Sequence, residues 1–113
     1  MDSILASTKK LAGLTDEYDY FDSEVIMYIN SVFMDLKQIG VGPVEGFVIE
    51  DESSIWEDFI SDNVVMREAV KSYMGGKVRL KFDPPTSSAH LEALKSTIAE
   101  SEWRLRLEAE LST

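Results

Sequence analysis

The sequence contains no cysteine, and its 113 residues include a single histidine, His90. Without cysteine the chain has no disulfide framework, no thiolate nucleophile and no thiolate zinc site. A lone histidine has no second histidine or cysteine with which to share a metal ion, so we interpret His90 as a surface residue. We expect the protein to use no metal and no cofactor.

Long apolar runs are also missing, since no stretch approaches the 18 or so consecutive apolar residues of a membrane-spanning helix. The first ten residues, MDSILASTKK, place an acid at position 2 and two lysines after the apolar part. A signal peptide has the opposite order, with its basic residues first. We therefore expect a soluble protein that has no membrane partner and is made in a cytosol.

Motifs for catalysis are missing as well. The segment MGGKV at 74–78 lacks the early glycine of a phosphate-binding loop and the Ser or Thr that follows its lysine. The acidic run EDE at 50–52 lacks the alternating ligands and the glycine of a calcium-binding loop, so we interpret it as a solvated loop. No Ser–His–acid set is indicated by spacing. We therefore expect that the protein is not an enzyme.

Basic residues are scarce in the first part of the chain. Residues 1–62 hold 14 acidic and 3 basic side chains, a net charge of −11, whereas residues 63–113 hold 7 acidic and 8 basic side chains, a net charge of +1. A protein with a total charge of −10 lacks the clustered Lys and Arg needed to bind phosphate backbones without sequence preference. The acidity either serves solubility alone, or it repels an anionic molecule or attracts a basic partner.

What the chain does contain is the apolar pattern of a helical protein. Apolar residues make up 44% of the sequence, enough for one domain spanning 1–113 to bury its own core. The i, i+3, i+4 spacing predicts an all-α, compact bundle of about four to five helices, with long helices near 23–39, 63–82 and 87–111. The clearest apolar stripe is formed by Val25, Ile29, Val32, Phe33, Leu36 and Ile39.

Individual residues predict where helices begin and end. Asp22 is placed to cap the first long helix, and Gly40 is placed to end it. An irregular loop is expected at about 40–53. After it, Ser54 and Glu57 have the spacing of a capping box, which predicts a short helix.

The second long helix carries two glycines in its middle. Gly75 and Gly76 each cost about 1 kcal/mol relative to alanine in a helix, so they mark either a kink or a close approach by another backbone. Pro84 forces Asp83 out of the helical region, which predicts that this helix ends near Phe82.

The last turns of the chain read WRLRLEAEL, residues 103–111, in which apolar and charged residues alternate. Alternation is typical of a strand with one solvated face, but Glu, Leu, Ala and Arg favour a helix, and the segment continues one. On a helix this pattern produces two apolar edges on nearly opposite sides, because two residues advance by about 200°. One edge holds Leu105 and Ala109, and the other holds Trp103, Leu107 and Leu111.

A helix at the edge of a small protein needs one apolar edge, so a second edge predicts a second neighbour. We expect a protein interface in this segment, formed by Trp103, Arg104, Leu105, Arg106, Leu107 and Leu111. Along the whole helix one stripe is formed by Leu91, Leu94, Ile98 and Leu105, and its earlier part, from Leu91 to Ile98, is expected to hold the helix on its own chain. The turns from Trp103 onward are therefore expected to serve assembly more than folding.

Three segments together resemble a known family. They read NSVFMDLKQIGVGP, WEDFI and KVRLKFDPPTSSAHLEALKSTIAESEWRLRLE, and they lie within the range from about Ser23 to Glu108. Over this range the chain is similar to the small head–tail connector proteins of tailed phages and prophages, also called adaptor or head-completion proteins. The most specific part is FDPPTSSAHLEALK, Phe82 to Lys95.

The resemblance implies a structural protein. Family members are compact helical subunits that form rings, commonly of about twelve copies, between the portal protein and the tail, and DNA passes through as cargo. The implied partners are other copies of this chain, the portal protein and a downstream tail or stopper protein. The implied location is the virion, at the head–tail interface, after assembly in the host cytoplasm. The long helix implicated in gripping the portal corresponds here to Ser87–Leu111.

A different kind of function is the alternative. An acidic binding module of a phage or prophage, such as an inhibitor or a DNA mimic, would occupy a basic surface on a host protein. The two functions differ in assembly, because a mimic acts as a monomer or dimer, whereas a connector forms rings alone or on its portal.

Overall fold

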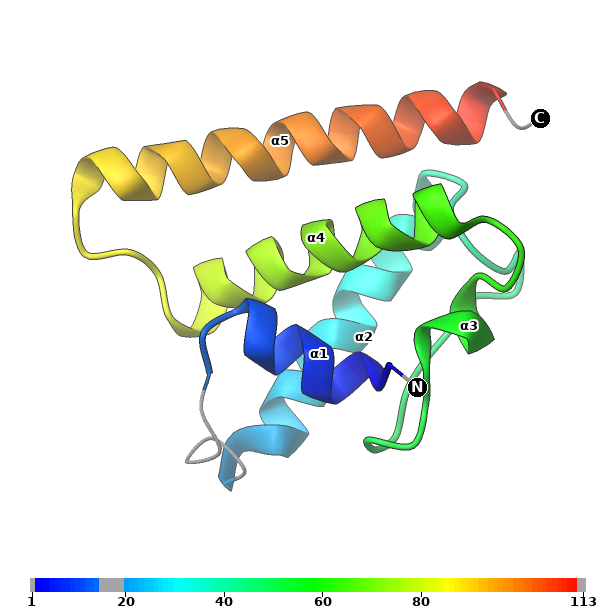
Figure 1. The fold of residues 1–113 in the computed structure, drawn as a ribbon, viewed down its shortest axis with the longest axis horizontal. Helices are drawn as coiled ribbons and strands as arrows, with labels where there is room; N and C mark the ends of the chain where they lie inside the picture. Colours follow the sequence, from blue (N-terminus) through cyan, green and yellow to red (C-terminus); the bar gives the residue numbers. More distant parts are fainter. Residues whose placement is uncertain (1, 15–19, 112–113) are drawn as a thin grey trace.

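The computed structural model describes residues 2–14 and 20–111, and this part of the chain contains five helices (Figure 1). They are α1 Ile4–Leu11, α2 Asp22–Gln38, α3 Trp56–Phe59, α4 Val64–Phe82 and α5 Ser88–Leu111. The same residues form no strand, and their one antiparallel bridge joins Ser3 to Ile55. The predicted all-α class is confirmed, and each of the three long helices begins and ends within one residue of its predicted bounds.

The helix α4 is central, since it packs with α1, α2 and α5. α5 runs antiparallel to α4 along one side of the molecule, and no other described helix lies beyond it (Figure 1). Its 24 residues span about 36 Å, nearly the longest dimension of the molecule, which is 39 Å. A long helix is therefore held mainly by one neighbour.

The start of α1 is fixed to the loop that precedes α3. The Ser3 hydroxyl accepts a hydrogen bond from the Ala6 amide at 3.2 Å and donates one to the Glu52 carbonyl at 2.8 Å. Further along α1, the Trp56 indole N–H donates to the Ser7 hydroxyl at 2.7 Å. These bonds connect segments about 49 positions apart in the sequence, so the loop is part of the folded body.

A side chain of α2 holds the irregular loop. Asn30 Oδ1 accepts from the Ile49 amide at 2.8 Å, and Asn30 Nδ2 donates to the Ile49 carbonyl at 3.0 Å. The two bonds satisfy the backbone groups of Ile49 as a neighbouring strand would, so this segment needs no strand partner. The side chain of Ile49 is buried in the core.

The core is one cluster of buried apolar side chains, to which all five described helices contribute. Five of the six predicted stripe residues of α2 are buried, and the sixth, Ile39, packs against the cluster. Four rings contributed by α2, α3 and the loop meet, with centroid separations between 4.7 and 6.3 Å. They belong to Phe33, Phe47, Trp56 and Phe59.

The two central glycines of α4 lie where neighbouring helices approach closely. A Cβ on Gly75 would lie 2.8 Å from Leu11 Cβ of α1, and a Cβ on Gly76 would lie 3.0 Å from Ile98 Cγ1 of α5. α4 continues as a single helix through both positions. Both glycines therefore mark close approaches, which are made by side chains of α1 and α5 and not by another backbone as the sequence suggested.

A hydrogen bond also joins α4 to α5. The Tyr73 hydroxyl donates to Glu102 Oε1 at 3.2 Å. Burial, together with the negative charge of Glu102, raises the pKa of Tyr73, so the phenol remains a protonated donor at neutral pH. The bond fixes the register of the two helices near their middle.

The predicted cap of α2 is wrong, although its predicted end is confirmed. Asp22 is the first helical residue, and the residue before it, Phe21, makes no side-chain capping bond. The Asp22 carboxylate instead accepts from Lys9 Nζ of α1 at 2.8 Å, so a tertiary ion pair replaces the local cap. Gly40 follows the end of α2 with a φ of +90°, the left-handed conformation expected of a helix-ending glycine.

The predicted capping box of α3 is wrong, and only half of such a box is present, one residue later. The Asp58 carboxylate accepts from the Ile55 amide at 3.0 Å, in place of the expected pair of Ser54 and Glu57. The Ser54 carbonyl is taken by the Ile4 amide at 2.9 Å, because this segment pairs with the start of α1. The tertiary contact therefore decides where α3 begins.

We predict that Gly75→Ala lowers the stability of the protein. Alanine favours a helix by about 1 kcal/mol, but its methyl group meets Leu11 Cβ, an atom that cannot move without its backbone. Overpacking of this kind costs about 1–3 kcal/mol, so the melting temperature should fall. Ser72→Ala, at an exposed position of the same helix, is the control and should change it little. A higher melting temperature for Gly75→Ala would show that the α1–α4 contact is not close.

Candidate protein-binding surface

The last turns of α5 carry two apolar edges, as the sequence predicts. Leu105 and Ala109 are buried, and Leu105 is only 1% exposed. Trp103, Leu107 and Leu111 lie on the other side of the helix and are 62%, 40% and 73% exposed. The segment is a helix, and its alternation separates an inner edge from an outer one. We call Trp103, Leu107 and Leu111 the outer edge of α5.

Two arginines flank the outer edge. Arg104 pairs with Glu100 at 2.5 Å, and Arg106 pairs with Glu102 at 3.8 Å, each one turn back along the helix. Glutamate before arginine at this spacing is the favourable order on a helix. Because the side chains remain exposed, these pairs add little stability, and both guanidinium groups are accessible to a partner.

A groove adjoins the outer edge, between the start of α4 and the end of α5. It has a volume of about 260 Å³, and Leu107 and Val65 contribute to it from the two helices. Val64 and Val65 are themselves exposed, so apolar surface extends from α5 onto α4. The full lining is Asn63, Val65, Met66, Ala69, Arg104, Leu105, Leu107 and Glu108. The groove was not predicted from the sequence, although Val64 and Val65 do not share the i, i+4 spacing of the buried residues Met66, Val70, Met74 and Val78.

The structure divides the six residues predicted to form the interface. Leu105 lies in the core of its own subunit, so we leave it out of the candidate surface. The other five, Trp103, Arg104, Arg106, Leu107 and Leu111, are exposed on α5. Burial of Leu105 and Ala109 also argues against the expectation that the turns from Trp103 onward are dispensable for folding, since these turns complete the core.

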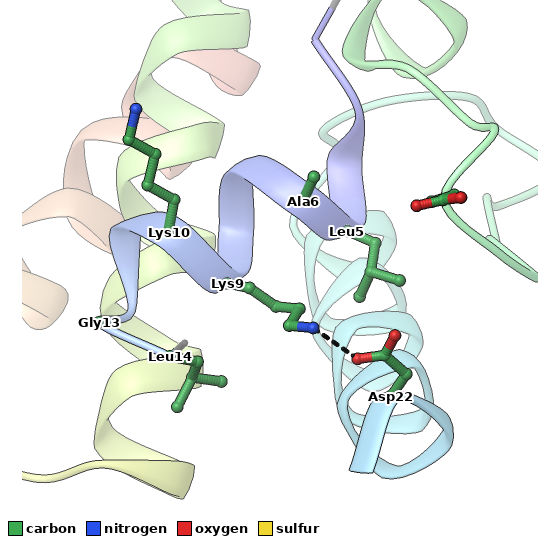
Figure 2. A pocket seen from close by; sticks show the side chains of 8 residues that line it. Leu5, Ala6, Lys9, Lys10, Gly13, Leu14 and Asp22 are labelled. Atoms are coloured by element: carbon green, nitrogen blue, oxygen red, sulfur yellow. Dashed lines mark hydrogen bonds and ion pairs between the residues drawn. The ribbon is translucent and has the colours of Figure 1, made fainter. Parts of the chain in front are cut away.

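A larger cavity lies elsewhere, beside α1 and the start of α2 (Figure 2). It has a volume of about 610 Å³ and is lined by Leu5, Ala6, Lys9, Lys10, Gly13, Leu14, Asp22 and Glu52. The ammonium group of Lys9 reaches Asp22, whereas the Lys10 side chain points away from the other labelled side chains (Figure 2). The lining offers an ion pair and apolar groups, with no arrangement of nucleophile and base.

The other polar features singled out in the sequence have ordinary surroundings. His90 is exposed in the first turn of α5, as expected of a surface residue. Residues 50–52 are exposed, and hydrogen bonds from the hydroxyl and amide of Ser53 lower the pKa of Asp51. Across 2–14 and 20–111, no three His, Asp or Glu side chains gather as metal ligands would. Among the helices of this same part, none is both long and apolar enough to cross a bilayer.

Comparison with known proteins identified a family to which the chain is similar. The model of a family described as phage connector protein matches residues 4–112, a range that includes all five described helices. No curated protein and no solved structure matched the chain. The match therefore covers both edges of α5 and the groove beside it.

We predict opposite outcomes for two leucines that lie two positions apart on α5. Leu105→Ala removes a fully buried side chain and should lower the free energy of unfolding by about 2–5 kcal/mol. Leu107→Ala removes a side chain from the exposed edge and should lower it by less than about 1 kcal/mol. Chemical denaturation of dilute protein measures both values. Equal losses would contradict the assignment of inner and outer edges.

Proposed function

The chain belongs to the phage connector protein family, and we propose that it is a head–tail connector subunit that assembles into a ring between portal and tail. The observation that carries this proposal is the exposed outer edge of α5. The family match and the all-helical fold of the described residues support a structural role.

The outer edge has the composition of an interface centre. Tryptophan is among the residue types most enriched where interfaces gain most of their binding energy. When a partner covers apolar surface, the complex gains about 25 cal/mol of free energy per Å² removed from water. A large aromatic side chain can bury about 150–250 Å². Trp103 is 62% exposed in the isolated subunit, so most of this gain is still available to a partner.

A ring requires a head-to-tail contact, in which two different surfaces of the subunit meet. α5 packs onto its own chain through the inner edge and keeps the outer edge for a neighbour. The partners that we propose are other copies of this chain, about twelve in a ring, together with the portal protein and a downstream tail or stopper protein. The ring occupies the head–tail interface of the virion, after assembly in the host cytoplasm.

The charge of the protein is suited to a passage for DNA. The chain has 21 acidic and 11 basic residues, so it lacks the excess of cations that would retain phosphate groups. We propose that DNA passes the ring as cargo without becoming a bound ligand. The excess of acidic side chains then repels the DNA backbone, which carries charge of the same sign.

The composition of the candidate surface also separates this function from an acidic inhibitor or DNA mimic. A mimic of DNA contacts its basic partner through carboxylates. The exposed apolar surface at the end of α5 consists instead of Trp103, Leu107 and Leu111, flanked by two arginines. This surface fits an apolar partner better than it fits a nucleic-acid-binding protein.

We predict that Trp103→Ala weakens assembly without unfolding the subunit. Loss of an aromatic anchor in an interface costs about 2 kcal/mol or more, roughly a 30-fold loss of affinity. Electron microscopy and size-exclusion chromatography, with the portal protein present and absent, measure ring formation. Trp103→Phe preserves much of the aromatic surface and should assemble better than Trp103→Ala.

Two controls separate assembly from folding in this experiment. The thermal melting of Trp103→Ala should match that of the original protein, because the side chain is exposed in the subunit. If Trp103→Ala forms rings with the same affinity as the original protein, the interface lies on another surface of the subunit. If the original protein remains a monomer or dimer with portal present, the inhibitor or mimic becomes the better explanation.

A further inference from the structure

The exposed side of α2 carries a second stripe that has no part in the fold. Five residues follow the i, i+4 and i+3 spacing along this side, and all of them are exposed: Ser23, Met27, Ser31, Met34 and Gln38. None is charged, although 28% of the residues in the chain are. Met27 and Met34 are 72% and 53% exposed. We call these five residues the α2 strip.

An uncharged row on a strongly acidic protein is typical of an interface. Single exposed apolar residues are common on protein surfaces and need no explanation. A full-length helical stripe without charge is different, because depletion of charged residues marks the centres of protein interfaces. Methionine is also over-used at binding surfaces, since its flexible thioether adapts to the partner and contacts aromatic rings favourably.

The strip continues onto the loop that follows α2. Met34, Phe47 and Val48 line one cavity of about 200 Å³, and Val48 is exposed. The two hydrogen bonds between Asn30 and Ile49 hold this loop against the helix. The surface is therefore formed before any partner arrives, so binding costs little ordering entropy.

Charge determines which surface fits the strip. The cavity beside Met34 is lined by one basic and one acidic side chain, Lys37 and Glu45, and residues 38–66, which include the loop, contain seven acidic side chains and no basic one. Two copies that met through this same surface would bring like charges together, which disfavours a two-fold contact. Arg104 and Arg106 are the basic groups beside the outer edge of α5; each is paired with a glutamate, but their side chains are 68% and 55% exposed and can also reach the acidic loop of a neighbour.

The two surfaces also agree in length and chemistry. The eight-residue separation of Trp103 and Leu111 corresponds to about 12 Å along a helix, and the seven-residue separation of Met27 and Met34 to about 10.5 Å. Each surface presents one narrow apolar row. An indole that packs on methionine gains a favourable sulfur–aromatic contact, which suits Trp103 against Met34.

We propose that the α2 strip, together with Val48, receives the outer edge of α5 from the next copy of this chain. The proposal rests on the proposed function, because it names the second surface of the ring contact. Each subunit donates α5 on one side and accepts a neighbour's α5 on α2. The contact is heterologous, so repetition closes a ring.

The absence of native cysteine allows a direct test by crosslinking. Met34→Cys and Leu107→Cys are made as separate single-cysteine variants of the full chain, mixed, assembled with and without the portal protein, and treated with a short bis-maleimide. The mixture should produce crosslinked dimers that contain one copy of each variant. In the control mixture, Lys10→Cys replaces Met34→Cys; Lys10 is exposed on α1. This mixture should produce few crosslinked dimers.

The same variants identify the results that overturn the proposal. Dimers formed by Leu107→Cys alone would show a two-fold contact through α5 and contradict the heterologous arrangement. Rings without crosslinks between the two variants would place the neighbour on another surface, while the proposed function would stand. If no assembly forms in any mixture or in the original protein with its portal, the proposed function itself fails.

Discussion

The contact between α4 and α5 determines how much of this chain is available for assembly. At Gly76 the two helices come so close that a Cβ would lie 3.0 Å from Ile98, and at the far end Leu105 and Ala109 close the core. This contact uses one edge of a 24-residue helix. The apolar residues on the other edge remain 40–73% exposed, so a second chain must cover them if they are to leave water.

The same arrangement explains why two separate surfaces occur on one small subunit. α2 and α5 both pack on α4. Each of the two helices buries one stripe of side chains in the core and exposes another stripe. The exposed stripe of α2 is uncharged and borders an acidic loop, whereas that of α5 is flanked by arginines. Two different surfaces are the requirement for a head-to-tail contact. The fold and the proposed assembly therefore depend on one central helix.

The helices and the two edges of α5 were predictable because they follow from periodicity, which is a local property of the sequence. Caps were less predictable: Asp22 pairs with Lys9, and the Ser54 carbonyl binds the start of α1, and both partners are distant in the sequence. The burial of Leu105 was predictable from the same periodicity, because Leu105 continues the stripe of Leu91, Leu94 and Ile98; its place among the interface residues was an error. The α2 strip was missed because a row of serine and methionine has weak apolar character, and its distinguishing mark is that the row itself holds no charge, although the exposed Glu24, Asp35 and Lys37 lie beside it.

The chain offers a direct test of the central claim that the outer edge of α5 is covered in the assembly. It has two tryptophans, of which Trp56 is 1% exposed and Trp103 is 62% exposed. Acrylamide quenching of the fluorescence, compared between the original protein and Trp103→Phe, isolates the signal of Trp103. We expect this signal to be readily quenched in the free subunit and protected once rings have formed. Rings in which Trp103 is quenched as readily as in the free subunit would contradict the account.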